Sequence, residues 1–381
     1  MRIASRARAT ERSVSPGSSQ GTRVAFAHAT SSYERWMRNH STVIESDLAS
    51  KHQLMKSDLF LFLRGTFYRW AQLWPEICAD LNRAPKVVAV GDLHVNSFGT
   101  WRDVEGRMAW GVDDFDDSYP LPYTSDLVRL AASLKVVSDL GHLTIKFKNG
   151  CELIVQGYRA SLKAGGCPIV LAERDAIMER LGIESIDPPD DFWEKLNRRP
   201  VRRRGIPRDA RHALERALPD NYLDYKIVMR KAGLGSLGQQ RFVAIAEWEG
   251  GCIAREAKAM VPSSCAWLNG HGGDRNSYYE QAIAGAVRAH DPFQKTVGRW
   301  IIRRLSPDSN PVEIGCLSKK RDEEKLLHAM GAEAANVHLG SRHRIKDILR
   351  DLDRRKTNWL RSAAKAMANA IEKDWKEYRS A

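Results

Sequence analysis

Hydrophobic residues change their spacing near the middle of this chain, and the change predicts two kinds of structure. In the first half they recur about every three to four positions, as on one face of a helix, over residues 31–55, 60–81, 126–140 and 151–163. From residue 222 onward, short apolar runs alternate with glycines and predict strands at 222–230, 240–248, 252–260 and 299–305. A helix at 277–289 and helical spacing after residue 323 complete the pattern. We therefore expect an α+β protein with a helical half and a smaller antiparallel β half.

Two acidic motifs follow short apolar runs within the helical half. Residues 91–94 (Gly-Asp-Leu-His) end the run 87–90, and residues 114–117 (Asp-Phe-Asp-Asp) follow the run 108–112, with a turn at Glu105-Gly106 between them. We expect the two runs to be neighbouring strands whose exits converge on one spot. Because crowded carboxylates repel unless a cation or proton separates them, the motifs predict a Mg²⁺ site and a phosphorylated substrate.

The size and composition of the chain limit its class. A chain of 381 residues has room for two domains or one large bilobal domain. No apolar run approaches the roughly 18 residues that a membrane helix needs, so we expect no membrane partner. The six cysteines contain no Cys-x-x-Cys pair, so neither a zinc site nor a disulfide framework is indicated. These features predict a cytoplasmic protein with reduced thiols.

The formal net charge of +13 favours anionic partners. Much of the excess lies in residues 1–24, which we expect to be a disordered basic tail, and in residues 186–215, which we expect to be a basic linker rich in arginine and proline. Nucleic acid is a conceivable partner of these two segments. It is not favoured, because no aromatic residues for base stacking interleave with the arginines of the linker.

A glycine-rich loop at 233–238 (Gly-Leu-Gly-Ser-Leu-Gly) decides between two phosphate-binding classes. In a dinucleotide-binding fold such a loop opens a helix, but here residues 241–246 (Arg-Phe-Val-Ala-Ile-Ala) read as a strand. A strand, glycine loop and strand in succession resemble a protein kinase, in which the loop covers the nucleotide phosphates. The alternative is a structural hairpin with a surface lysine. The resemblance implies phosphate contacts from Gly233, Gly235, Ser236, Gly238 and Lys258 on the following strand.

The kinase resemblance also implies roles in the first half. Asp92 would accept the proton of the substrate hydroxyl, and Asp114 would bind Mg²⁺ beside the nucleotide phosphates, with Asp116 as a further ligand. The sequence of residues 91–94 is more similar to that of aminoglycoside phosphotransferases than to that of Ser/Thr kinases. Ser97 stands where those families place a metal-binding Asn, so Asn96 is the substitute candidate. The catalytic half also precedes the nucleotide half, which implies a circularly permuted fold.

Further residues are candidates for the same site. His94 follows Asp92 closely and is either a site residue or a hydrogen-bonding residue of the loop. Arg64 is expected to bind a phosphate or to pair with the acidic cluster. Arg303 lies in an otherwise apolar strand, where an unpaired charge is costly, and is a candidate ligand contact. For Lys258 the expected partner is Glu280, with Glu256 as competitor.

A closer resemblance covers the chain from about residue 30 to the C-terminus. The chain resembles the bacterial family called domain of unknown function 2252. The segments that carry the resemblance are 62–66, 91–99, 114–117, 126–133, 233–238, 255–259 and 300–305. The chain departs from the family pattern at Ser97, Asp113 and Asp117. The resemblance implies relatedness and not a particular reaction.

Together these observations predict a bilobal, permuted kinase-like protein. Its expected parts are the tail 1–24, a helical lobe with the acidic motifs at 25–185, the linker 186–215, a β-rich nucleotide-binding lobe at 216–310 and a C-terminal helical region at 311–381. The expected function is that of an ATP- and Mg²⁺-dependent phosphotransferase that acts on an unknown small molecule. The activity of this phosphotransferase is expected to be either full or weakened.

Two other classes stay open. A metallophosphoesterase-like hydrolase also uses Gly-Asp-x-His, but needs an Asn-His pair, which occurs here only at Asn39-His40. A non-catalytic nucleic-acid-binding or scaffold protein would use the basic tail and linker.

Overall fold

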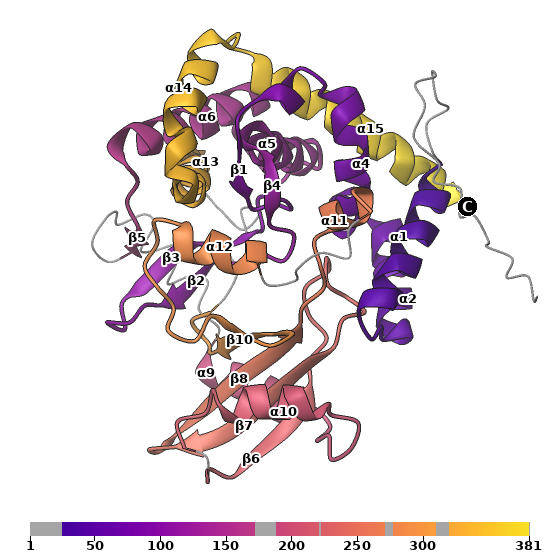
Figure 1. Ribbon diagram of the computed structural model, residues 1–381, viewed down its shortest axis with the longest axis vertical. Coiled ribbons are helices and arrows are strands. Elements are labelled where there is room, and N and C mark those ends of the chain that lie inside the picture. The colour runs from indigo at the N-terminus through magenta and orange to yellow at the C-terminus, as the bar shows by residue number, and fades with distance from the viewer. Residues whose placement is uncertain (1–24, 172–187, 221, 271–276, 310–319, 381) are drawn as a thin grey trace, which may run out of the picture.

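The computed structural model describes residues 25–171, 188–220, 222–270, 277–309 and 320–380. Helices form a large lobe, and a five-stranded sheet forms most of a smaller lobe beside it (Figure 1). The predicted α+β class is confirmed. The basic tail 1–24 lies outside the described residues. Within the described ranges, no helix is both long and apolar enough to cross a membrane.

The N-terminal part of the helical lobe contains α1 (Phe26–His40), α2 (Glu45–Ser57), α3 (Leu59–Gly65) and α4 (Phe67–Ile77). The single helix predicted at 60–81 is thus two helices that break at Thr66. The Thr66 hydroxyl donates to the carbonyl of Phe62 at 2.7 Å, and such side-chain bonds to the backbone compete with the helix. Asp58 caps α3 by accepting a hydrogen bond from the Leu61 amide.

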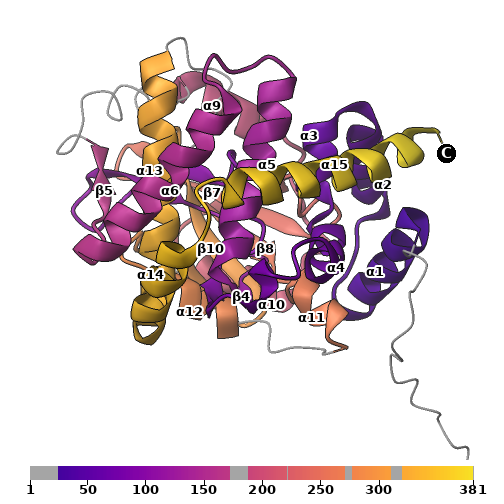
Figure 2. The same cartoon turned by 90° about the horizontal axis from the view of Figure 1, so that it is seen from above.

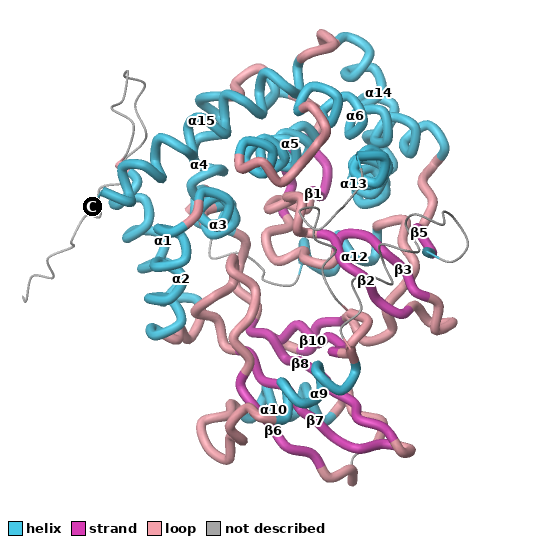
Figure 3. The backbone as a smooth tube through the Cα atoms, turned by 180° about the vertical axis from the view of Figure 1, so that it is seen from behind, coloured by secondary structure: helices cyan, strands magenta, loops and turns pink. Residues whose placement is uncertain are grey.

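The centre of the helical lobe is α5 (Tyr123–Asp139), whose residues are almost all buried. It is surrounded by α6 (Phe147–Ala164), α13 (Lys320–His338) and α15 (Trp359–Ser380), as Figure 3 shows from behind. Seen from above, α15 lies across α5 (Figure 2). Glycines let α6 and α13 touch closely, because a Cβ at Gly157 would lie 1.9 Å from the carbonyl oxygen of His328. The helical lobe also contains η1 (Leu81–Arg83), η3 (Leu339–Arg344) and α14 (Ile345–Arg354).

Two small sheets carry the acidic motifs. β1 (Lys86–Ala89) pairs with β4 (Tyr119–Pro122), while β3 (Met108–Val112) pairs with β2 (Phe98–Arg102) and β5 (Ile169–Val170). The prediction that the two motif-bearing strands are neighbours is therefore wrong. Asp103 accepts hydrogen bonds from the amides of Glu105 and Arg107 and so turns β3 back onto β2. β4 then returns beside β1, so the two acidic loops still meet.

The sheet of the small lobe is antiparallel, with the order β6-β7-β8-β10-β9. Its strands are β6 (Tyr225–Met229), β7 (Arg241–Trp248), β8 (Gly251–Ala259), β9 (Lys295–Val297) and β10 (Trp300–Leu305). The segment predicted as a solvated linker contains α9 (Pro189–Asn197) and α10 (Arg208–Glu215), which cover opposite faces of this sheet. Each of the two helices has an apolar side, which explains why this segment packs as helices. Leu196 of α9 and Leu214 of α10 are buried against the strands.

The stretch between β8 and β9 leaves the small lobe. It forms α11 (Ser264–Leu268) and α12 (Ser277–Gly285), whose apolar side chains Cys265 and Ile283 join the core of the helical lobe. The predicted β-rich region 216–310 is therefore shared between the two lobes. The connection is reinforced at the glycine loop, where the amide of Ile44 donates to the carbonyl of Gly238 at 2.7 Å.

Candidate functional site

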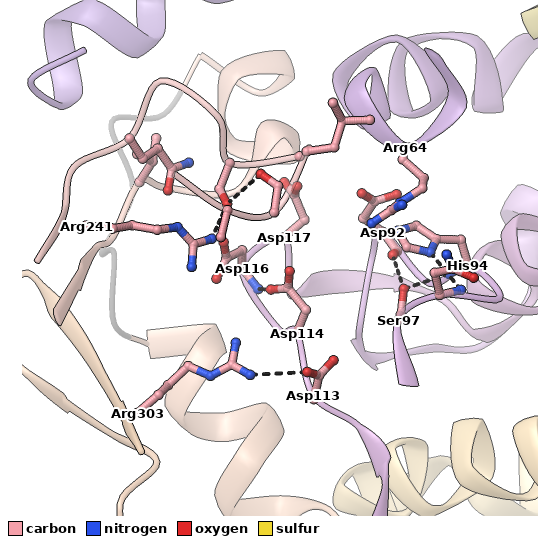
Figure 4. Close-up of a pocket in the computed structure, with 18 of the residues that line it drawn as sticks. Arg64, Asp92, His94, Ser97, Asp113, Asp114, Asp116, Asp117, Arg241 and Arg303 are labelled. Carbon is pink, nitrogen blue, oxygen red and sulfur yellow. Dashed lines mark hydrogen bonds and ion pairs between the residues drawn. The ribbon is translucent and has the colours of Figure 1, made fainter. Parts of the chain in front are cut away.

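A cleft of about 270 Å³ lies between the two lobes and is lined by both acidic motifs and by the glycine loop (Figure 4). Of the predicted site residues, the following line it: Arg64, Asp92, His94, Asn96, Asp114, Asp116, Gly233, Gly235, Ser236 and Arg303. Lys258 lies beneath the lining with its ammonium bonded to Asp116. Gly238 is not among the lining residues and packs near Leu48 of α2 instead.

Gly91 explains how the two acidic loops come together. Its φ of +85° is a conformation that L side chains rarely adopt. A Cβ at this position would lie 2.3 Å from the carbonyl oxygen of Asp117. Only glycine therefore allows the loop of Asp92 to pass so close to the loop of Asp117.

Asp92 has one carboxylate oxygen held and the other facing the cleft. Arg129, which is completely buried on α5, donates to Oδ1 through Nε at 3.0 Å and through Nη2. The ideal Cβ position of Gly235 in the glycine loop lies 3.9 Å from Oδ2. Burial raises the pKa of Asp92, with the charge of Arg129 opposing it. The carboxylate is thus fixed in direction and more basic than an ordinary aspartate.

The loop of Asp92 is held from behind by a buried hydrogen-bond chain. Asp126 accepts from the amides of Val90 and Gly91 at 2.7 and 2.9 Å. The Nε2 atom of His338 lies 2.9 Å from Asp126, and its Nδ1 lies 2.8 Å from the hydroxyl of Tyr158. A carboxylate can only accept, so Nε2 donates to Asp126 and Nδ1 accepts from Tyr158. His338 was not predicted as a support of this loop, because it lies 212 residues from Asp126 in the chain.

The residues after Asp92 divide into loop supports and cleft residues. Ser97 is buried; its hydroxyl accepts from the amide of His94 and donates to the carbonyl of Asp92, both at 3.0 Å. His94 accepts the amide of Asn96 on Nδ1, and burial followed by the charges of Arg64 and Arg129 lowers its pKa well below the ordinary value. His94 is therefore a neutral ring, and it lines the cleft together with Asn96.

Lys258 projects from β8 toward the second acidic motif. Its Nζ is bonded to Asp116 and lies 3.8 Å from Oδ1 of Asp114. Burial and the nearby Asp114 carboxylate raise the pKa of Asp116 to about 6. Burial would also raise the pKa of Asp114, but the charges of Lys258 and Arg303 hold it below its usual range. The Asp114 side chain keeps 51% of its surface exposed at the cleft, so it is open to a ligand.

Neither glutamate predicted as the partner of Lys258 has that role. Glu280 accepts a hydrogen bond from the hydroxyl of Thr296. Glu256 is buried between Arg230 and Arg241, each 3.0 Å away. Burial opposes ionisation of Glu256, but these two guanidinium groups lower its pKa to about 2. The prediction for Glu256 failed because residues two apart on a strand point to the same face but can pair with different charges.

Cationic side chains form the wall of the cleft that belongs to the small lobe. Arg303 donates to Asp113 at 3.1 Å (Figure 4), and Arg241 donates to the hydroxyl of Ser236 in the glycine loop. Arg230 and Arg304 complete this wall. The arginines of β7 and β10 were not all predicted, since an isolated arginine in a strand is not distinctive in sequence.

Asp117, the last residue of the second acidic motif, and Lys51, which no sequence motif indicated, also belong to the site. Asp117 accepts the amide of Ser264 at 2.7 Å, and burial together with the charge of Asp92 raises its pKa to about 7. Lys51 of α2 donates to the carbonyl of Gly235 at 2.7 Å, and burial lowers its pKa to about 8. Lys51 thus ties the N-terminal helices to the glycine loop.

The acidic residues do not form a closed metal cage. Within the described parts of the chain, no group of three or more His, Cys, Asp or Glu side chains is arranged to hold a metal ion. Mg²⁺ commonly binds through one or two carboxylates and completes its shell with phosphate oxygens and water. Asp114, Asp116 and Asn96 line the cleft and are the candidate ligands for such a shared site. The Asn39-His40 pair ends α1 and is not among the lining residues.

The fold and the cleft together define a two-lobed α+β protein. In its cleft, aspartates of the helical lobe face arginines of the small lobe. A family model described as "Uncharacterized protein conserved in bacteria (DUF2252)" matches residues 43–187. The resemblance to this family is thereby confirmed over the segment that carries both acidic motifs. The glycine loop and Lys258 lie beyond the matched segment. No curated protein and no solved structure gives a significant match to the chain.

Proposed function

We propose that this protein is a Mg²⁺-dependent phosphotransferase that uses a nucleoside triphosphate and a small-molecule acceptor, on a permuted kinase-like arrangement. The observation that carries the proposal is the meeting of four distant segments in one cleft. Gly235 approaches Asp92, and Lys258 reaches Asp114 and Asp116, although these segments are far apart in the chain. Glycine loop, lysine and two aspartate motifs are the parts that phosphoryl transfer requires.

The small-lobe side of the cleft suits the phosphates of the donor. Backbone amides of the glycine loop and the guanidinium groups of Arg241 and Arg303 are donors for phosphate oxygens. Bound Mg²⁺ would neutralise charge on the transferring phosphate, with Asp114, Asp116 and Asn96 available to hold it. Lys258, now bonded to Asp116, is close enough to exchange that partner for a phosphate.

The helical side of the cleft suits the acceptor. Asp92 would take the proton from the acceptor hydroxyl as its oxygen bonds to the terminal phosphorus, and the bond from phosphorus to the bridging oxygen breaks to release the nucleoside diphosphate. Arg129 orients Asp92 for this transfer by holding Oδ1 and leaving Oδ2 toward the cleft. Ser97 supports the loop through its hydrogen bonds, which leaves the metal-binding role of the expected Asn to Asn96.

Nucleotide binding tests the proposal with two variants. The melting temperature of the wild-type protein should rise with ATP only when Mg²⁺ is present, because a ligand that binds the folded state stabilises it. Asp114→Ala should abolish this shift, and Lys258→Ala should weaken ATP binding by about tenfold or more. Exposed Lys163→Ala on α6 serves as a control that keeps the shift.

Titration calorimetry with the same variants gives the decisive result. Equal ATP affinity in wild type, Asp114→Ala and Lys258→Ala would refute the site. Hydrolysis of a generic phosphodiester that a chelator abolishes would instead indicate the hydrolase class. Loss of phosphoryl transfer in Asp92→Asn with ATP affinity retained would support the role of Asp92.

A further inference from the structure

A second cavity, of about 510 Å³, lies on the side of the helical lobe that is turned away from the small lobe (Figure 1). It is lined by residues of α6, by the end of α14 and by the start of α15. The residues that line it are all different from those that line the cleft. Its volume is within the range of roughly 300–1,000 Å³ that is usual for small-molecule sites. The cavity is therefore large enough for a ligand of its own.

One part of the lining is apolar. Leu352 and Leu360 belong to the core of the helical lobe, and Val155 and Trp359 are half-buried beside them. Burial raises the pKa of the Cys151 thiol to about 12, so this residue is a neutral part of the wall. Apolar and aromatic side chains are what ligand pockets use to hold the body of a small molecule.

The rest of the lining has more cations than carboxylates. The cationic side chains are Lys148, Arg159, Arg355, Lys356 and Arg361, and the carboxylates are Glu152 and Asp353. Three of these cations have a carboxylate partner, in the pairs Lys148–Glu152, Arg159–Asp353 and Arg355–Asp351. Among the described residues, none forms an ion pair with Lys356 or Arg361. Two positive charges therefore line the cavity without a counter-charge from the chain.

One short segment supplies both of these charges. Lys356 lies in the connection between α14 and α15, and Arg361 lies in the first turn of α15. The amide of Trp359 donates to the carbonyl of Lys356 at 3.0 Å, which turns the chain at this point. Thr357 and Asn358, between the two cations, also line the cavity and add polar hydrogen-bonding groups. Charge and hydrogen-bonding groups are thus gathered beside the apolar part of the lining.

We propose that this cavity binds an organic phosphate, that is, a phosphate monoester with an apolar or aromatic body. A phosphate monoester carries roughly 1.5 to 2 negative charges near pH 7, which matches the two cations that have no partner. The guanidinium group of Arg361 can bind two phosphate oxygens at once, and the ammonium group of Lys356 adds a point charge. The body of the ligand lies against Val155 and Trp359. Because the cavity is separate from the cleft, this inference does not depend on the proposed function.

Titration calorimetry of the full chain with three ligands, in the presence of a metal chelator, tests the proposal. Phenyl phosphate has a ring and a phosphate, phenyl sulfate has the same ring with a single negative charge, and inorganic phosphate lacks the ring. Phenyl phosphate should bind at least about tenfold more tightly than either of the other two. Equal affinity for phenyl sulfate would contradict the selection of phosphate, and equal affinity for inorganic phosphate would contradict the role of the apolar lining. Failure of phenyl phosphate to bind would overturn the proposal.

Four variants locate the bound ligand. Arg361→Gln and Lys356→Gln each remove one charge without removing an apolar group from the core, and each should weaken phenyl phosphate binding by about tenfold. Lys365→Gln, at an exposed position of α15 that does not line the cavity, is the matched control and should bind phenyl phosphate like wild type. Arg303→Gln removes a cation from the cleft and should also leave this affinity unchanged. Loss of binding in Arg303→Gln, with wild-type affinity in Arg361→Gln and Lys356→Gln, would place the ligand in the cleft and refute the second site.

Discussion

At the level of single residues, one buried carboxylate behind the cleft is held by hydrogen bonds from the backbone and from a side-chain amide. Glu333 of α13 is a buried carboxylate outside the cleft that supports the end of β3. It accepts the amide of Val112 at 3.2 Å and the side-chain amide of Asn336 at 2.8 Å. Gly111 allows this contact, since a Cβ there would lie 2.3 Å from Oε1 of Glu333. Burial raises the pKa of Glu333 to about 7, with the charge of Arg288 opposing the rise.

The raised pKa of Glu333 predicts a defined pH dependence of stability. The folded state keeps this proton up to about pH 7, whereas the unfolded state loses it near pH 4.5. The contribution of Glu333 to stability therefore falls as pH rises from about 4.5 to 7 and is constant above. Glu333→Gln cannot lose a proton, so its stability relative to wild type should increase by up to about 3 kcal/mol across this range. Urea unfolding at several pH values measures the difference in unfolding free energy between the variant and wild type. A difference that does not change with pH would contradict the prediction.

At the level of helices and strands, the support of the loop that carries Asp92 comes from elements that are remote in sequence. Asp126 begins α5 and His338 ends α13, and together they hold the amides at the end of β1. Ser341 in η3 adds a further bond by accepting the amide of Val88 at 3.0 Å. The C-terminal helices therefore have a part in the geometry of Asp92 without touching the cleft.

His338→Ala should show that this support is functional. The change removes a donor from Asp126 and leaves the hydroxyl of Tyr158 without its acceptor, which costs about 1–3 kcal/mol of unfolding free energy. As a positioning residue, His338 should affect the rate of phosphoryl transfer while the ATP dissociation constant stays the same. Tyr158→Phe removes only the far end of the chain and should cost about 1 kcal/mol. Denaturant unfolding and turnover kinetics distinguish the two variants, and an unchanged rate in His338→Ala would remove the positioning role.

Across the whole molecule, the N-terminal helices connect the two lobes. α2 belongs to the helical lobe, yet Lys51 holds the carbonyl of Gly235 and Ile44 holds that of Gly238 in the glycine loop. Gly65 makes room for Met55 of α2, since a Cβ at Gly65 would lie 2.5 Å from Sδ of Met55. The position of the loop over Asp92 is therefore set jointly by both lobes.

Lys51→Met should release this connection without emptying the space. Methionine is similar in length but cannot donate a hydrogen bond, so amide hydrogen exchange over residues 233–238 should accelerate. Loss of about 1 kcal/mol of loop preorganisation should weaken ATP binding by about fivefold. Lys56→Met, on the exposed side of the same helix, is the control. Exchange rates equal to wild type in Lys51→Met would show that the loop is held without this bond.

Much of the fold was predictable, and so was the meeting of Asp92 and Asp114 at one cleft. Helical and strand periodicity located most elements, although Thr66 broke one predicted helix and the linker contained α9 and α10. Asp92 and Asp114 were identified because each follows a strand within a short acidic motif. Arg129 and Lys51 were not, because a basic residue on a helix has no distinctive pattern until its partner is known.

The sequence by itself determined the α+β class, the acidic motifs and the glycine loop, because local spacing and backbone freedom are properties of neighbouring residues. Only the tertiary structure decided which charges meet. It joined β1 to β4 rather than to β3, gave Lys258 the partner Asp116, and filled the apolar face of the sheet with α9. These pairings depend on packing between segments that are not neighbours in the chain, where burial fixes a charge beside whichever partner the fold supplies.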